Sequence, residues 1–148
     1  IVQPIGARLT ASVANPNSTA KQNVIPEIER LTVIIRFLNV PATGTIPHPI
    51  MEILASTWNL LDAASKRFPQ DNNLAEKICR LHKHALRTCG AVAYAPMLDA
   101  LMDQLVRSYE STRLSPFLYA ASICVTEYGR EPQFAPKLFN MISALANT

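Results

Sequence analysis

The sequence predicts an all-α fold in which antiparallel helix pairs stack into a superhelix of the HEAT or armadillo type. Apolar residues recur at helical spacing in six segments, and no stretch alternates with period two for long enough to indicate a strand. Alternate helices begin near residues 47, 92 and 131. The intervals of about 45 and about 39 residues bracket the roughly 40–47-residue period of these repeats, and a closed helix bundle is the alternative.

The N-terminal part of the chain contains two helix signals of different strength. Residues 1–12 form the weaker candidate, and the polar stretch 15–22 is expected to be a loop. The stronger helix has Pro26 in its first turn and ends at Pro41. Its apolar stripe, spaced i, i+3, i+4 and i+7, consists of Leu31, Ile34, Ile35 and Leu38.

The next two helices are bounded by residues that suit helix ends. One begins after Pro49 and closes before Pro69, and Trp58 completes its apolar stripe, so we expect this ring to anchor the core. The other begins after Asp71, whose carboxylate suits an N-cap, and ends at Gly90, which suits the first position beyond a helix. This second helix carries the main functional signal of the chain.

Three further helices complete the pattern. Pro96 either opens the first of them or kinks a turn that begins near Val92, and Ser115 begins the second. We expect Tyr119 and Tyr128 on that second helix to be buried in the core of a helix pair rather than stacked on nucleic acid. The whole chain, 1–148, then divides into approximate repeats at 1–40, 46–90 and 91–129, with a further helix at 131–147.

The helix between Asp71 and Gly90 has a cationic face. At about 100° per residue, four cations and one histidine fall within an arc of roughly 120°, opposite the apolar side chains. The four cations, which we name the cationic stripe, are Lys77, Arg80, Lys83 and Arg87, and the histidine is His84. Repulsion between like charges at this spacing costs roughly a few tenths of a kcal/mol per pair, which an anionic partner would relieve. A simply solvated face is the alternative.

Composition limits the classes of function. With 49% hydrophobic residues the chain can bury a core, and no apolar run reaches the roughly 18 residues of a membrane span. A net charge of +3 is far from the strongly basic footprint of an RNA-binding domain. The odd number of cysteines, Cys79, Cys89 and Cys124, indicates no disulfide framework and favours a reducing compartment. The chain opens at Ile1 with neither an initiator Met nor a signal-like segment, so we expect an excised piece of a longer protein.

The sequence gives no indication of an enzyme or of a cofactor. Neither a nucleophile elbow nor a phosphate-binding glycine loop is present, and the acidic residues are scattered. Cys79, His82 and Cys89 lie on one helix and are spaced too widely for a four-ligand zinc site. We therefore expect structural thiols and neither a catalytic nor a metal site.

Several segments carry a family resemblance. They are Glu29-Arg-Leu-Thr-Val-Ile-Ile-Arg-Phe, His48-Pro49 with Trp58, Glu76-Lys-Ile-Cys-Arg with Arg87 and Gly90, and Phe117-Leu-Tyr-Ala-Ala-Ser-Ile-Cys-Val-Thr-Glu-Tyr-Gly129. Together they resemble the transportin-SR (transportin-3) branch of the importin-β superfamily of nuclear transport receptors. The resemblance is strongest between about residue 27 and residue 130, and importin-13 is the nearest alternative.

The resemblance implies a HEAT-repeat fragment from the C-terminal half of a nuclear import receptor that shuttles between nucleus and cytoplasm. Receptors of this branch import serine/arginine-rich (RS) proteins through nuclear pores, and RanGTP releases the cargo. Ran and the nucleoporins would bind outside this fragment, and neither a membrane nor direct nucleic-acid binding is implied. A generic protein-interaction scaffold is the alternative function.

The resemblance also implies candidate binding residues. The family receives the phosphorylated RS segment on a basic helix at the concave face, whose position matches the helix after Asp71, so the cationic stripe becomes the cargo site. Each phosphoserine brings about −1.5 to −2 charges that a row of cations can pair. Lys77 and Lys83 stand where the family tends to place arginine. Arg30, Arg36 and His84 are secondary candidates.

Overall fold

The structure of the chain is a computed structural model that describes residues 2–14, 21–38 and 48–148. Its helices are α1 (Val2–Ala14), α2 (Lys21–Phe37), α3 (Pro49–Arg67), α4 (Asn72–Cys89), α5 (Ala91–Thr112), α6 (Ser115–Tyr128), the short 3₁₀ helix η2 (Pro132–Phe134) and α7 (Ala135–Ala146). The described residues contain no strand. The all-α prediction is confirmed, including the weak first helix.

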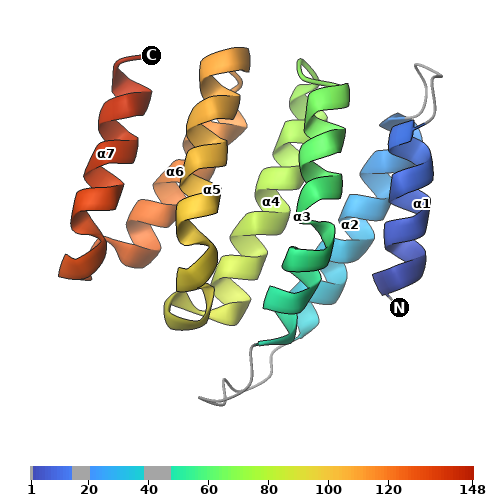
Figure 1. Cartoon of the computed structure of the whole chain (residues 1–148), viewed down its shortest axis with the longest axis horizontal. Helices are drawn as coiled ribbons and strands as arrows, with labels where there is room; N and C mark the ends of the chain where they lie inside the picture. Colours follow the sequence, from blue (N-terminus) through green and yellow to red (C-terminus); the bar gives the residue numbers. More distant parts are fainter. Residues whose placement is uncertain (1, 15–20, 39–47) are drawn as a thin grey trace.

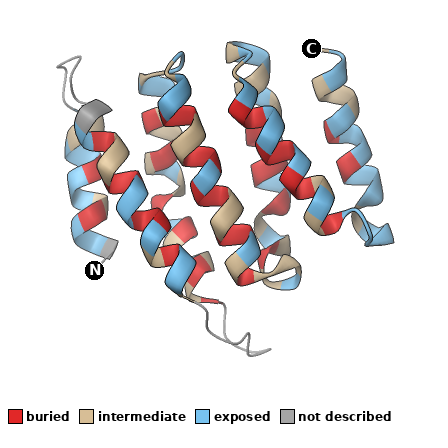
Figure 2. Ribbon diagram, turned by 180° about the vertical axis from the view of Figure 1, so that it is seen from behind, coloured by how far each residue is buried: buried red, intermediate tan, exposed pale blue. Residues whose placement is uncertain are grey.

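The helices form two layers. Helices α1, α3, α5 and α7 lie in one layer, and α2, α4 and α6 lie in the other and contact one another in that order (Figure 1). Because α1 and α7 lie at opposite ends of the row, the helices form an open stack of the HEAT type and not a closed bundle. The apolar core is one cluster that runs between the layers, where the buried residues gather (Figure 2).

The ends of α4 are set as the sequence predicts. The Asp71 carboxylate accepts a hydrogen bond from the Leu74 backbone N–H at 3.0 Å, which satisfies one of the free donors of the first turn. Gly90 closes α4 by donating its N–H to the Leu86 carbonyl at 2.9 Å, and it also precedes the first residue of α5. Its φ of 89° and ψ of 156° lie in a region that side chains rarely adopt.

Replacing Gly90 with alanine is therefore expected to lower the free energy of unfolding by about 1–3 kcal/mol, because the cost comes from the backbone. A Cβ at Gly90 would meet no atom of the described residues within 4 Å. Gly6→Ala is the matched control, since Gly6 lies inside α1 and its Cβ would approach only Leu60 Cδ1, at 3.9 Å. This control should gain about 0.5–1 kcal/mol. Urea denaturation measures the free energy of unfolding of both variants. Equal changes in the two would contradict a backbone cost at Gly90.

Two prolines lie inside helices, at the sixth residue of each. The prediction that Pro26 sits in the first turn was wrong, because α2 already begins at Lys21. The predicted loop 15–22 was too long at its end for the same reason, since residues 21 and 22 are helical. Pro96 lies inside α5, which begins at Ala91, so the alternative of a turn that starts before this proline is the correct one. In each helix the turn before the proline buries a side chain completely, Val24 in α2 and Tyr94 in α5, and this burial offsets the lost backbone hydrogen bond. Pro41 lies outside the described residues.

The aromatic predictions had mixed outcomes. Trp58 is half-buried and packs against the core, with its ring 5.0 Å from the ring of His82. Tyr128 is buried, as predicted, and its hydroxyl donates to the Ala91 carbonyl at 2.6 Å. Burial of Tyr119 was wrong, because its side chain is 54% exposed. Helix α6 is apolar on several sides, so its sequence did not mark which tyrosine faces the core.

Candidate functional site

The cationic stripe lies on the outer side of α4, the middle helix of its layer. The opposite side of α4 is buried in the core through residues that include Leu74, Ile78, Leu81 and Leu86. Helices α2 and α6 flank α4 on its two sides (Figure 2). The stripe is therefore bordered by two neighbouring helices, and side chains from both reach it.

The two stripe cations in the first half of α4 have carboxylate partners. Lys77 Nζ lies 3.0 Å from Glu29 Oε1 on α2, and the lysine side chain is only 19% exposed. This ion pair ties α4 to α2. Arg80 Nη2 lies 2.5 Å from Glu76 Oε1 one turn earlier on the same helix, and both side chains are 46% exposed. The second pair is therefore a surface ion pair within one helix.

The other two stripe cations reach toward α6. Arg87 Nε lies 3.3 Å from Glu127 Oε1. Lys83 Nζ lies 5.6 Å from the ring centroid of Tyr119, a cation–π contact. Among the described residues, Lys83 is the one stripe cation without a carboxylate partner.

His84 lies within a field of positive charge. Partial burial lowers the pKa of His84 from its ordinary value, and the nearby charges of Lys83, Arg36, Arg80 and Arg87 lower it further. Arg36, on α2, is exposed and lies 6.0 Å from the ring centroid of Phe37. The structure thus brings Arg36 and His84, both secondary candidates, together with the stripe.

The third secondary candidate does not join this face. Arg30 pairs with Glu27 on its own helix, and Arg8 Nε of α1 donates to the same carboxylate oxygen at 2.8 Å. Glu27 is buried, so the two arginines compensate its charge. Arg30 therefore belongs to a contact that holds α1 on α2.

The three carboxylates of this face, Glu29, Glu76 and Glu127, were not predicted as partners of the stripe. The pair between Glu76 and Arg80 has a sequence signal, because the two residues are four apart on one helix. Glu29 and Glu127 have none, because their distance from the stripe depends on how α2 and α6 pack against α4. The face combines cations with internal counter-charges.

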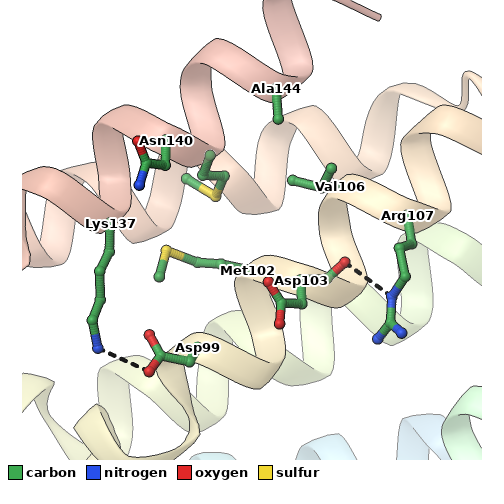
Figure 3. A pocket seen from close by; sticks show the side chains of 9 residues that line it. Asp99, Met102, Asp103, Val106, Arg107, Lys137, Asn140 and Ala144 are labelled. Carbon is green, nitrogen blue, oxygen red and sulfur yellow. Dashed lines mark hydrogen bonds and ion pairs between the residues drawn. The ribbon is translucent and has the colours of Figure 1, made fainter.

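A separate hollow of about 540 Å³ lies between α5 and α7, in the other layer (Figure 3). It is lined by Asp99, Met102, Asp103, Val106, Arg107, Lys137, Asn140, Met141 and Ala144. Lys137 Nζ closes one side by pairing with Asp99 Oδ2 at 2.8 Å, and Arg107 Nε donates to the Asp103 carbonyl at 3.3 Å. Both acidic and basic side chains line this hollow, so it lacks the uniformly positive potential of an anion-binding site.

The buried thiols are poor nucleophiles. Cys79, Cys89 and Cys124 are all buried and free, and burial raises the pKa values of their thiols to about 12, 11 and 12. Within residues 2–14, 21–38 and 48–148, no group of His, Cys, Asp and Glu could hold a metal ion. None of the described helices has the length and apolar character of a membrane span.

Comparison with known proteins identifies a family. A family model described as the fourth TPR domain of transportin-3 and importin-13 matches residues 48–148, more than half of the chain. Transportin MOS14 of Arabidopsis thaliana is 24% identical over 118 residues, which cover 80% of this chain and 12% of that protein. An uncharacterised protein of Schizosaccharomyces pombe is 24% identical over 115 residues, which cover 78% of this chain and 12% of that protein.

Proposed function

The chain belongs to the transportin-3 and importin-13 family, and we propose that it is a segment of a nuclear import receptor that binds phosphorylated RS cargo through the cationic stripe. The proposal places this chain in the transportin-SR branch of that family. One observation carries it: three stripe cations of α4 and Arg36 of α2 gather around His84 on one side of the layer, and the three arginines among them are exposed. Family membership supports the transport role, and the face supports an anionic ligand.

The chemistry of phosphoserine fits this face. A phosphate group carries about −1.5 to −2 charges at neutral pH and three strong acceptor oxygens. Arg80 and Arg87 are about half exposed and can grip it in two places, whereas Lys83 supplies a point charge. Alternating serine and arginine in the cargo would place several phosphates along the roughly 15 Å between residues 77 and 87 on the helix.

The rest of the transport cycle belongs to the proposal for the whole receptor. This chain spans about 12% of the curated relatives that it matches. Binding of Ran, contact with nucleoporins and shuttling between nucleus and cytoplasm would then depend on regions outside this chain. We propose no enzymatic activity for the segment, in line with a family of transport receptors.

A generic scaffold is the second candidate, and one observation favours it. Three of the four stripe cations already have carboxylate partners within the chain, and such ion pairs are common on protein surfaces that bind no ligand. In that case the segment would only hold distant parts of the receptor in place. RNA binding is the weaker third candidate.

A titration tests the proposal against both alternatives. The protein is titrated with one RS peptide, phosphorylated and unphosphorylated, and with an unrelated RNA oligomer, at low and physiological salt. We expect the phosphorylated peptide to bind at least about tenfold more tightly at physiological salt. Binding that ignores phosphate and disappears with salt would support the scaffold. Tighter, salt-dependent binding to the RNA would support the third candidate.

A further inference from the structure

The two arginines of the cationic stripe are already occupied by carboxylates from the chain itself. Glu76 occupies Arg80 from one turn earlier on α4, and Glu127 occupies Arg87 from α6. Both contacts lie at the surface, because the side chains of all four residues are between 31% and 46% exposed. Each contact engages one N–H group of a guanidinium that has five, so an anionic ligand that binds the whole guanidinium competes with a glutamate.

These two ion pairs differ from the third one on this face. The pair between Lys77 and Glu29 joins two helices through a lysine that is only 19% exposed, so it contributes to the packing of α4 on α2. Surface ion pairs such as those of Glu76 and Glu127 contribute little to stability and exchange readily with other ions. Only Arg80 and Arg87 are thus both occupied and accessible to a ligand.

The charge of the incoming group decides whether the exchange is favourable. A carboxylate from a peptide that replaces Glu76 exchanges one negative charge for another, so Arg80 gains nothing. A phosphate brings about −1.5 to −2 charges and a third acceptor oxygen, so its exchange for a carboxylate strengthens the contact at each arginine. The guanidinium fork also binds phosphate in two places, which a single glutamate at 3.3 Å from Arg87 does not match.

We propose that Glu76 and Glu127 compete with the ligand for Arg80 and Arg87 and thereby lower the affinity of this face for every anionic ligand. Phosphorylated serine, the stronger ligand, still binds, whereas acidic but unphosphorylated peptides, which bind more weakly, are held below a useful affinity. Lys83, which contacts Tyr119 and has no carboxylate partner among the described residues, is the cation that a ligand meets without competition. This inference rests on the proposed function, because it names how the same face chooses its ligand.

The test removes both competitors without changing the shape of their side chains. The variant Glu76→Gln/Glu127→Gln is titrated with two peptides of one RS sequence, one with phosphoserine and one with glutamate at each serine position. The wild-type chain should prefer the phosphopeptide by about tenfold or more, since only phosphate gains by the exchange. In the variant both peptides should gain by a similar factor, about two- to tenfold, because each of them competes with the same two glutamates in the wild-type chain.

A second variant controls for net charge. Glu52→Gln/Glu110→Gln also removes two exposed carboxylates, but from α3 and α5 in the other layer. It should leave the affinity for both peptides unchanged, and circular dichroism should show that both variants are fully helical. No gain for either peptide in the Glu76 and Glu127 variant, or the same gain in the control variant, would overturn the inference while the proposed function stands. If neither peptide binds the wild-type chain or the variant, the proposed function itself is wrong and the inference with it.

Discussion

The double variant Arg80→Glu/Arg87→Glu is expected to bind the phosphorylated RS peptide about a hundredfold more weakly than the wild-type chain. A hydrogen bond to a charged group contributes about 1.5–3 kcal/mol, so the loss of two of them costs about 3 kcal/mol or more. The new glutamates add repulsion toward the phosphates. Both arginine side chains are about half exposed, so the helix content should stay the same.

Two other arginines provide the matched control for that variant. Arg107 of α5 and Arg130, which follows α6, are exposed and lie outside the stripe. Arg107→Glu/Arg130→Glu changes the net charge by the same amount, so a general electrostatic effect would weaken binding equally in both variants. Isothermal titration at physiological salt measures the difference. Unchanged affinity in the Arg80 and Arg87 variant would disprove the assignment of the cargo site.

The exposed face of α4 was predictable because it depends on one helix alone. The spacing of Lys77, Arg80, Lys83 and Arg87 fixes their common side as soon as the segment is helical. Asp71 and Gly90 fix where the helix begins and ends, through a side-chain cap and through a positive φ. Both signals are local in sequence and need no knowledge of neighbouring helices.

The partners of the stripe were not predictable because they depend on how helices pack. Glu127 is 40 residues from Arg87, and the contact of Lys83 with Tyr119 also joins α4 to α6. The burial of Tyr119 was predicted wrongly for the same reason. Pro26 shows that tertiary burial overrides local preference, since α2 extends five residues before the proline.

The stability of the chain is expected to decrease by roughly 3 kcal/mol between pH 7 and pH 4 because of His82. This residue lies on the buried side of α4 against Trp58, and neither ring nitrogen has a hydrogen-bond partner among the described residues. Burial lowers the pKa of His82 to about 4, whereas the unfolded chain has an ordinary value near 6.5. Between these values the unfolded state binds a proton that the folded state does not.

The sign follows from that difference in bound protons. The contribution of neutral His82 is complete above about pH 6.5, and it is lost progressively as the pH falls toward 4. His82→Phe keeps a ring against Trp58 and removes the titrating group, so its stability should fall less steeply with pH. At pH 7 the variant should be as stable as the wild-type chain or about 1 kcal/mol more stable, because it removes two buried polar atoms that have no partner in the described part of the chain.

Urea denaturation of the wild-type chain and of His82→Phe across this pH range measures the effect. His84→Gln is the control, because His84 lies on the same helix but is only partly buried among the stripe cations, so its loss should change the slope less. An equal slope in the wild-type chain and in His82→Phe would show that His82 is not held neutral by burial. His82 and the cationic stripe lie on opposite sides of one helix, so protonation of His82 would weaken the packing that holds the stripe in place. Ligand binding measured below about pH 6 would therefore decrease partly because the folded state is less stable.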